Sequence, residues 1–150
     1  TACKEGCSGG KIEQALIQAV EEGEKKKKLR MRLQFQVADV KKPLISVKRI
    51  VEKGNHVHFG PSATDCYISN PQSGKKFPLK FDGVGTWVME VELSGEKTQI
   101  TVDSGAADSV SPNNWGSKFP MMDVPKRRFV TAGGKVLPHH GQRTVKVRPF

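Results

Sequence analysis

The sequence has no apolar run that approaches the roughly 20 residues needed for a membrane-spanning helix, so we expect no membrane partner. It has only three cysteines, Cys3, Cys7 and Cys66, which are too few for a disulfide framework and favour an intracellular, cytoplasmic compartment. Cys3 and Cys7 have no second cysteine pair at zinc-ligand spacing. We therefore expect no metal site, and no motif calls for a cofactor.

Acidic residues are scarce, with 15 Asp and Glu against 25 Lys and Arg, for a formal net charge of +10. Such a balance favours acidic partners, including nucleic acid. The dense part of this charge is confined to four lysines at 25–28 with Arg30 and Arg32. Aromatic side chains, only 7% of the chain, are not interleaved there, so a base-stacking platform is not indicated. We favour a solvated linker or charged edge strand and keep nucleic-acid binding as a weakly supported alternative.

Residues 1–28 differ in character from the rest of the chain. A small, polar loop precedes an apolar pattern at spacings of three and four, which predicts an amphipathic helix over 11–24. The members of the pattern are Ile12, Ala15, Leu16, Ala19 and Val20. The lysine-rich linker at 25–28 then leads to a β-rich domain over 29–150.

That domain alternates short β-prone segments with turn residues. Strict alternation predicts a half-buried strand over 29–37, and a short helix is expected over 44–53, ending at Gly54-Asn55. Further strands are expected at 56–59, 66–69, 77–81, 86–93, 98–102 and 142–147, with 94–97 as a link. Gly133-Gly134 marks a hairpin. Many short strands with one helix predict a mostly β fold, a small closed barrel.

The tetrad Asp103-Ser104-Gly105-Ala106 follows the β-prone run at 98–102 and precedes Ser109. The tetrapeptide alone is typical of an ordinary turn. An acidic residue at a strand end, followed by a small hydroxyl residue and a glycine, can also present a catalytic carboxylate. Carboxylate-driven amide hydrolysis needs two carboxyls that share a proton. The chain has one such tetrad, so activity requires a dimer.

Two other aspartates do not supply the missing partner. Asp39 has no glycine after it, and Asp108 is too close in sequence to Asp103 and is expected to hydrogen-bond locally. The pair His139-His140 is expected to face solvent, and His56 and His58 are expected to pack on one face of a strand. Trp87 and Trp115 are expected in a core or an interface.

Residues 100–112 (ITVDSGAADSVSP) resemble the catalytic segment of the retroviral-type aspartic proteases, the retropepsins, in particular those of retrotransposon polyproteins. Residues 129–147 look like the flap hairpin and the strand after it. Residues 35–50 look like the C-terminal half of the same fold. The resemblance covers 29–150 and implies a small closed β-barrel of the retroviral acid-protease type.

The resemblance also implies roles for individual residues. Asp103, Ser104 and Gly105 would be catalytic, in a homodimer acting on a peptide or polyprotein substrate. The resemblance further implies substrate contacts from Ala106, in the floor of the site, and from the flap tip, which would consist of Thr131, Ala132, Gly133, Gly134 and Lys135.

The two halves of the family's fold stand here in swapped order. Residues 29–93 resemble the C-terminal half and 98–150 the catalytic half. A circular permutation explains this, because the ends of a domain often lie close together. A chain cut across two neighbouring repeats explains it equally. The alternative function is a catalytically inactive, domesticated retroelement domain that serves as a binding or structural subunit.

Overall fold

The computed structural model describes residues 29–150. The helix expected over 11–24, Cys3, Cys7 and the lysines at 25–28 lie outside the described residues. The strands are β1 (Met31–Ala38), β2 (Leu44–Ser46), β3 (His56–Phe59), β4 (Cys66–Ser69), β5 (Lys76–Pro78), β6 (Lys80–Phe81), β7 (Trp87–Leu93), β8 (Glu96–Asp103), β9 (Val110–Ser111), β10 (Met121–Met122), β11 (Phe129–Val130), β12 (Val136–Leu137) and β13 (His139–Pro149). The helix is α2 (Val47–Glu52).

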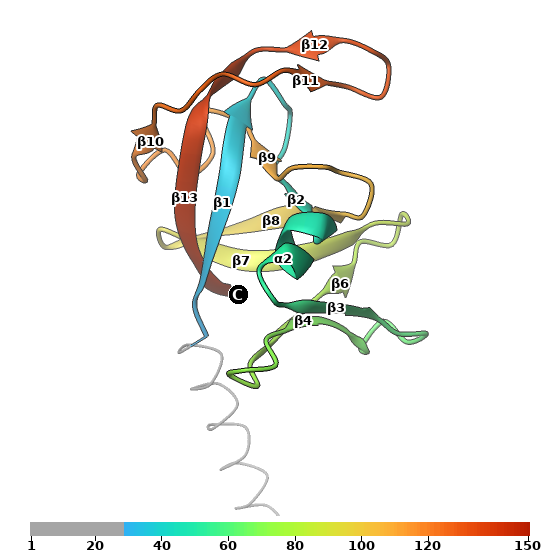
Figure 1. Cartoon of the computed structure of the whole chain (residues 1–150). Coiled ribbons are helices and arrows are strands. Elements are labelled where there is room, and N and C mark those ends of the chain that lie inside the picture. The colour runs from blue at the N-terminus through green and yellow to red at the C-terminus, as the bar shows by residue number, and fades with distance from the viewer. Residues whose placement is uncertain (1–28) are drawn as a thin grey trace, which may run out of the picture.

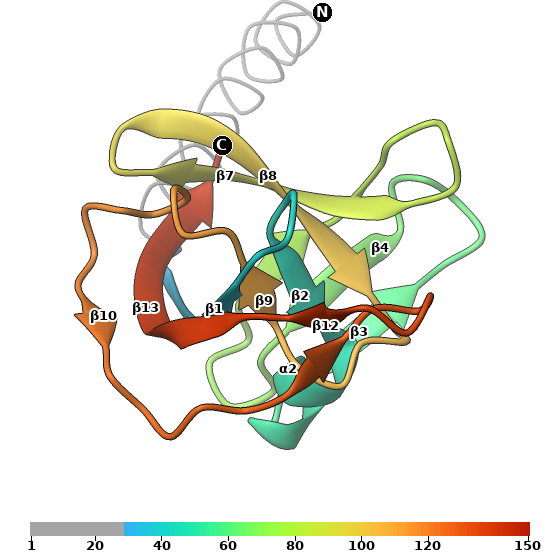
Figure 2. The same cartoon turned by 90° about the horizontal axis from the view of Figure 1, so that it is seen from above.

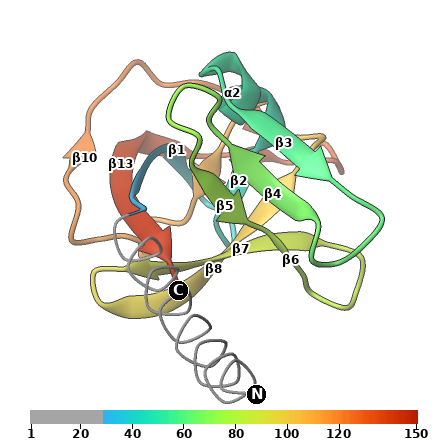
Figure 3. The ribbon, with the colours of Figure 1, turned by 90° about the horizontal axis from the view of Figure 1, so that it is seen from below.

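Six strands close into a barrel, which confirms the predicted mostly β fold with one short helix. Their order is β13-β1-β9-β2-β8-β7, and β7 pairs again with β13 to complete the circle. Strands β10 and β6 extend this sheet beyond β13 and β7. A separate sheet of β3, β4 and β5 lies beside α2 at the lower end of the barrel (Figures 1 and 3). Residues 29–150 contain no helix of the length and apolarity that a membrane crossing requires.

The alternating residues of β1 explain where the core lies. Leu33, Phe35 and Val37 point inward and are buried, whereas Arg32 and Gln34 are exposed. β13 pairs along the whole of β1 and alternates in the same way. Each fully buried large apolar side chain stabilises the fold by about 1.5–3 kcal/mol. The largest fully buried apolar side chains of the barrel and the adjoining sheet are Phe35, Phe77, Met89, Ile100, Val37, Val91, Val145 and Val147.

The helix is shorter than the expected 44–53. Leu44–Ser46 instead form β2, which pairs in parallel with the end of β8, so tertiary strand pairing overrides the local helical pattern. Ser46 then caps α2, since its Oγ accepts a hydrogen bond from the backbone N–H of Arg49 at 3.3 Å. The predicted stop is confirmed at Gly54, which has a φ of 88°.

The expected link at 94–97 is a tight turn of a hairpin. Ser94 (φ 53°) and Gly95 (φ 84°) form its two central residues, and Glu96 and Lys97 already belong to β8. Two successive positive φ values match the twist of the flanking strands, which is why such a short connection suffices. Met31 pairs with Val147, so the start of β1 and the end of β13 lie side by side.

Candidate functional site

Asp103 is the last residue of β8, between β2 on one side and β7 on the other. It is half-buried and lies opposite Ser46 in the parallel register of β2 and β8. Its Oδ1 accepts a hydrogen bond from the backbone N–H of Gly105 at 2.9 Å, which folds the chain back over the end of the strand. Ser104 and Gly105 are exposed. The barrel therefore presents one carboxylate at a strand end, on a short turn, as the tetrad predicts.

Ser46 clamps the loop at 103–109 from below. Its Oγ donates to the carbonyl of Ala106 at 2.6 Å, and its backbone N–H donates to Ser109 Oγ at 2.9 Å. Ser46 is fully buried. Two hydrogen bonds from one buried residue hold both the middle and the end of the loop, so the position of Asp103 is tied to the barrel wall. Sequence reasoning missed this role, because a serine inside an expected helix carries no signal for a partner 60 residues away.

Asp108 bridges two arginines that are distant in sequence. Its Oδ1 accepts from Arg49 Nε at 2.9 Å and its Oδ2 accepts from an Arg127 guanidinium N–H at 3.0 Å. The hydrogen bond that Arg49 donates to Asp108 raises the pKa of the Arg49 guanidinium above its ordinary value. The expectation of local hydrogen bonding is wrong, because the arrangement of β9, α2 and the segment before β11 brings both guanidiniums to the carboxylate. Asp39 is hydrogen-bonded to His140, whose Nε2 lies 2.6 Å from Asp39 Oδ1. Asp108 and Asp39 are thus both committed elsewhere and do not form a dyad with Asp103.

The hairpin predicted around Gly133-Gly134 is present as β11 and β12. Thr131 N–H donates to the carbonyl of Lys135 at 2.8 Å, and Gly134, with a φ of 86°, closes the turn by donating to the carbonyl of Thr131. Residues 131–135 are exposed. The hairpin projects on the same side of the barrel as the loop after β8 (Figures 1 and 2). Contact of its tip with a substrate stays a prediction.

His139 anchors the base of this hairpin. It is 8% exposed, its Nδ1 accepts from the backbone N–H of Arg127 at 2.9 Å, and its Nε2 lies 2.9 Å from both Gln36 Oε1 and the carbonyl of Gly141. The expected solvent-facing histidine pair is therefore wrong for His139 and right for His140, which is exposed. Successive residues of a strand point to opposite faces, so the two histidines cannot share one. The alternation that runs on to Val147 is the signal that could have revealed this.

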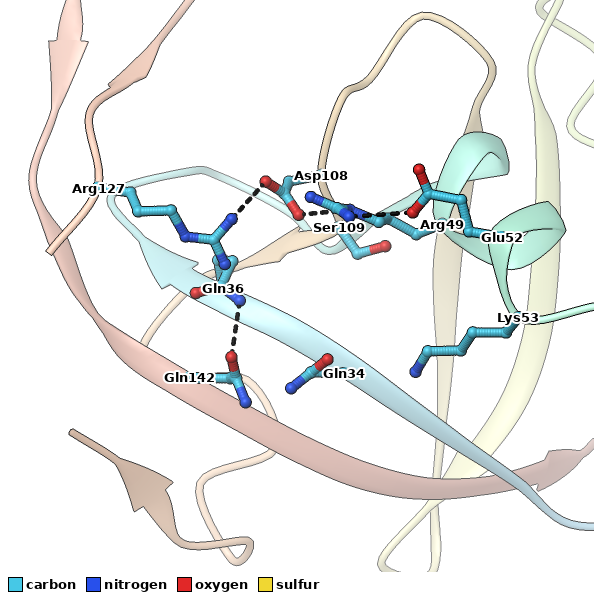
Figure 4. A pocket seen from close by; sticks show the side chains of 9 residues that line it. All are labelled: Gln34, Gln36, Arg49, Glu52, Lys53, Asp108, Ser109, Arg127 and Gln142. Carbon is cyan, nitrogen blue, oxygen red and sulfur yellow. Dashed lines mark hydrogen bonds and ion pairs between the residues drawn. The ribbon is translucent and has the colours of Figure 1, made fainter. Parts of the chain in front are cut away.

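A polar cavity of about 260 Å³ opens between α2, β1, β13 and the segments that precede β9 and β11 (Figure 4). Asp108 and Ser109 form one of its walls, so it shares a wall with the loop that carries Asp103. The other lining residues are Gln34, Gln36, Arg49, Glu52, Lys53, Arg127 and Gln142. Sequence reasoning did not find this cavity, because its charged and amide side chains come from five separate segments.

An aromatic surface borders the Asp103 strand on its other side. The ring of Trp87 lies 5.1 Å from that of Phe81 and 5.8 Å from that of Phe59. Phe81 and Phe59 are 46% and 43% exposed, and Trp87 pairs with Val102, the residue before Asp103. Trp87 packs against the core.

The histidines and cysteines of the described chain do not form a metal-binding cluster. His56 and His58 are both exposed, and the ring of His58 stacks on that of Tyr67 with their centroids 4.9 Å apart. Between residues 29 and 150, no three His, Cys, Asp or Glu side chains are grouped as metal ligands would be. Comparisons with protein-family models, with curated proteins and with solved structures find no match to this chain.

Proposed function

We propose that this chain is an aspartic endopeptidase of the retropepsin type, which hydrolyses peptide bonds as a homodimer with one Asp103 from each subunit. The observation that carries the proposal is the Asp103 carboxylate, which ends a central barrel strand on a loop clamped by Ser46. Gly105 N–H occupies Oδ1 of Asp103, while Oδ2 makes no hydrogen bond within residues 29–150 and is available to a water molecule.

The chemistry needs two such carboxylates a few ångströms apart. Their repulsion keeps one proton on the pair, so one carboxyl removes a proton from the attacking water while the other donates one to the substrate carbonyl. Water is the nucleophile, and no covalent intermediate with the protein forms. The β11–β12 hairpin would cover an extended peptide, holding it by backbone hydrogen bonds.

Three features support a second copy of the chain at Asp103. Each chain carries a single tetrad, so a dyad can form only between chains. The exposed rings of Phe59 and Phe81 beside Trp87 provide apolar surface that borders the Asp103 strand. Strand β3 pairs only with β4 among the described strands, which leaves one edge of this sheet for a partner.

The swapped order of the two halves is best explained as a circular permutation. The turn at Ser94-Gly95 would join the ends that the family leaves open, and the new ends would lie next to each other at Met31 and Val147. One chain closes the barrel without a second repeat, which supports permutation over a cut across neighbouring repeats. The inactive binding or structural subunit remains the second candidate, favoured by the swapped order of the halves and by the net positive charge of the chain.

The decisive experiment compares the wild-type protein with Asp103→Asn on a mixture of extended peptides at acidic pH, with products identified by mass spectrometry. We expect the wild type to cleave and Asp103→Asn to leave every peptide intact while its thermal unfolding is unchanged. Asp123→Asn, the same substitution at a side chain that is 94% exposed, is the matched control and should cleave normally.

Sedimentation of the same samples reports the oligomeric state. Cleavage by a pure Asp103→Asn sample, or cleavage by a strictly monomeric wild type, refutes the dyad. A wild type that is monomeric and inactive supports the binding or structural subunit instead.

A further inference from the structure

The polar cavity lies between the loop that follows Asp103 and the base of the β11–β12 hairpin. Asp108 and Ser109 of its wall belong to the loop that follows Asp103. Arg127, on another wall, comes two residues before β11 of the hairpin. A peptide held between the hairpin and the loop would therefore pass the mouth of this cavity.

The acceptors of the lining are largely occupied. Both oxygens of Asp108 are held by arginines, and Oε2 of Glu52 accepts from Arg49 at 3.0 Å. Gln36 is also engaged, since its Oε1 lies 2.9 Å from His139 Nε2 and its Nε2 donates to Gln142 Oε1 at 3.0 Å. The cavity therefore has few acceptors to offer to a cationic or donor-rich ligand.

Donors, in contrast, remain available. Within residues 29–150 Lys53 forms no ion pair. Figure 4 shows its ammonium extending from the end of α2 toward the amide of Gln34 on β1. Arg127 uses one of its N–H groups on Asp108 and keeps others for a ligand. An ammonium, an amide and a guanidinium around one cavity match the donor pattern that binds a carboxylate.

We propose that this cavity binds the carboxylate of a Glu or Asp side chain of the peptide substrate, outside the residues that flank the cleaved bond, with Lys53 as the main contact. The inference rests on the proposed endopeptidase function and adds a preference for acidic sequences. The excess of basic residues in the chain as a whole acts in the same direction, because it attracts acidic peptides.

The test measures binding apart from cleavage. Fluorescein-labelled extended peptides carry a single Glu at successive positions, and each has a partner with Gln at that position. Fluorescence anisotropy with the Asp103→Asn protein gives the dissociation constant of each peptide without hydrolysis. At one position we expect Glu to bind about fivefold to tenfold more tightly than Gln, the size of a charge-assisted contact in a partly exposed site.

Charge variants then assign the contact. Lys53→Gln should abolish the preference for Glu, and Lys53→Glu should reverse it, so that a Lys-containing peptide binds more tightly than the Glu peptide. Lys53 is exposed, so neither change should affect folding. Lys146→Glu, an equal loss of positive charge on the outer face of β13, is the control and should retain the preference.

Equal binding of Glu and Gln peptides at every position overturns the proposal, as does an equal effect of Lys146→Glu and Lys53→Glu. A single-stranded RNA oligomer that binds through Lys53 when acidic peptides do not overturns it in favour of phosphate. Peptide cleavage by the wild type without an acidic preference refutes this inference alone. A preference that depends on Lys53, in a wild type that cleaves nothing, supports the cavity as a peptide site and refutes the endopeptidase.

Discussion

Replacement of Ser46 by alanine tests whether the loop after β8 is held in place by one buried hydroxyl. Ser46 Oγ donates to the carbonyl of Ala106 at 2.6 Å and accepts from the N–H of Arg49 at 3.3 Å. Alanine fills most of the same volume but makes neither hydrogen bond. The variant therefore removes two polar contacts while it leaves the apolar packing nearly unchanged.

The expected cost follows from these two contacts. Loss of an N-cap hydroxyl costs about 1 kcal/mol, and an unsatisfied carbonyl at Ala106 adds about 1–2 kcal/mol. The free energy of unfolding should thus fall by about 2–3 kcal/mol. For a domain of the size of residues 29–150, each 1 kcal/mol corresponds to about 4 °C in the melting temperature, so Ser46→Ala should melt about 8–12 °C lower.

Ser111 offers a matched control, because it is also 0% exposed but its Oγ has no hydrogen-bond partner. Ser111→Ala removes the same hydroxyl without breaking a contact, so its melting temperature should equal or exceed that of the wild type. Circular dichroism melts and urea titrations of both variants provide the measurement. Equal destabilisation by Ser46→Ala and Ser111→Ala, or a Ser46→Ala protein as stable as the wild type, would refute the clamp.

Two further substitutions test other contacts of the barrel. Lys80 Nζ donates a hydrogen bond to Glu90 at 2.8 Å, and Lys97 lies nearby; both lower the pKa of the Glu90 carboxyl below its ordinary value. The ionised Glu90 therefore stabilises the fold above its unfolded-state pKa, and this stabilisation is lost as the pH falls through the folded-state pKa. In urea titrations, Glu90→Gln should lower the free energy of unfolding by about 1 kcal/mol at neutral pH and leave it unchanged at strongly acidic pH. A loss of stability that does not depend on pH would contradict this assignment. Arg143, 4% exposed, donates to three backbone carbonyls of the segment after β9, and its burial lowers the pKa of its guanidinium. Arg143→Met should lower the free energy of unfolding by about 3 kcal/mol and alter the fluorescence of Trp115, because the wild-type Arg143 donates to the carbonyl of that residue. An unchanged free energy of unfolding would show that Arg143 does not stabilise this segment.

Elements that depend on neighbouring residues were predictable from the sequence. The strands at 56–59 and 66–69, the helix stop at Gly54 and the hairpin around Gly133-Gly134 all match the structure. Each follows from alternation or from the ability of glycine to adopt positive φ, and both signals are local. Closure of the strands into a barrel was also predictable, because many short strands with a single helix have few ways to cover one apolar face.

Contacts that join distant segments were not predictable. Leu44–Ser46 became a strand because the end of β8 was available to pair with them. The partners of Asp108 lie 59 and 19 residues away along the chain. No local pattern encodes such pairs, since a charged side chain looks the same in sequence whether it meets water or another charge.

The sequence by itself determined that Asp103 ends a strand and that Gly105 follows in a turn, because residue type and spacing suffice for both. Only the tertiary structure decided what holds that carboxylate in place and what surrounds it. Ser46, Arg49 and Arg127 reach the loop through β2, α2 and the hairpin base, and each depends on strand pairing across the barrel. The physical reason is that turn chemistry acts over a few bonds, whereas the clamp and the cavity exist only after the chain has closed on itself.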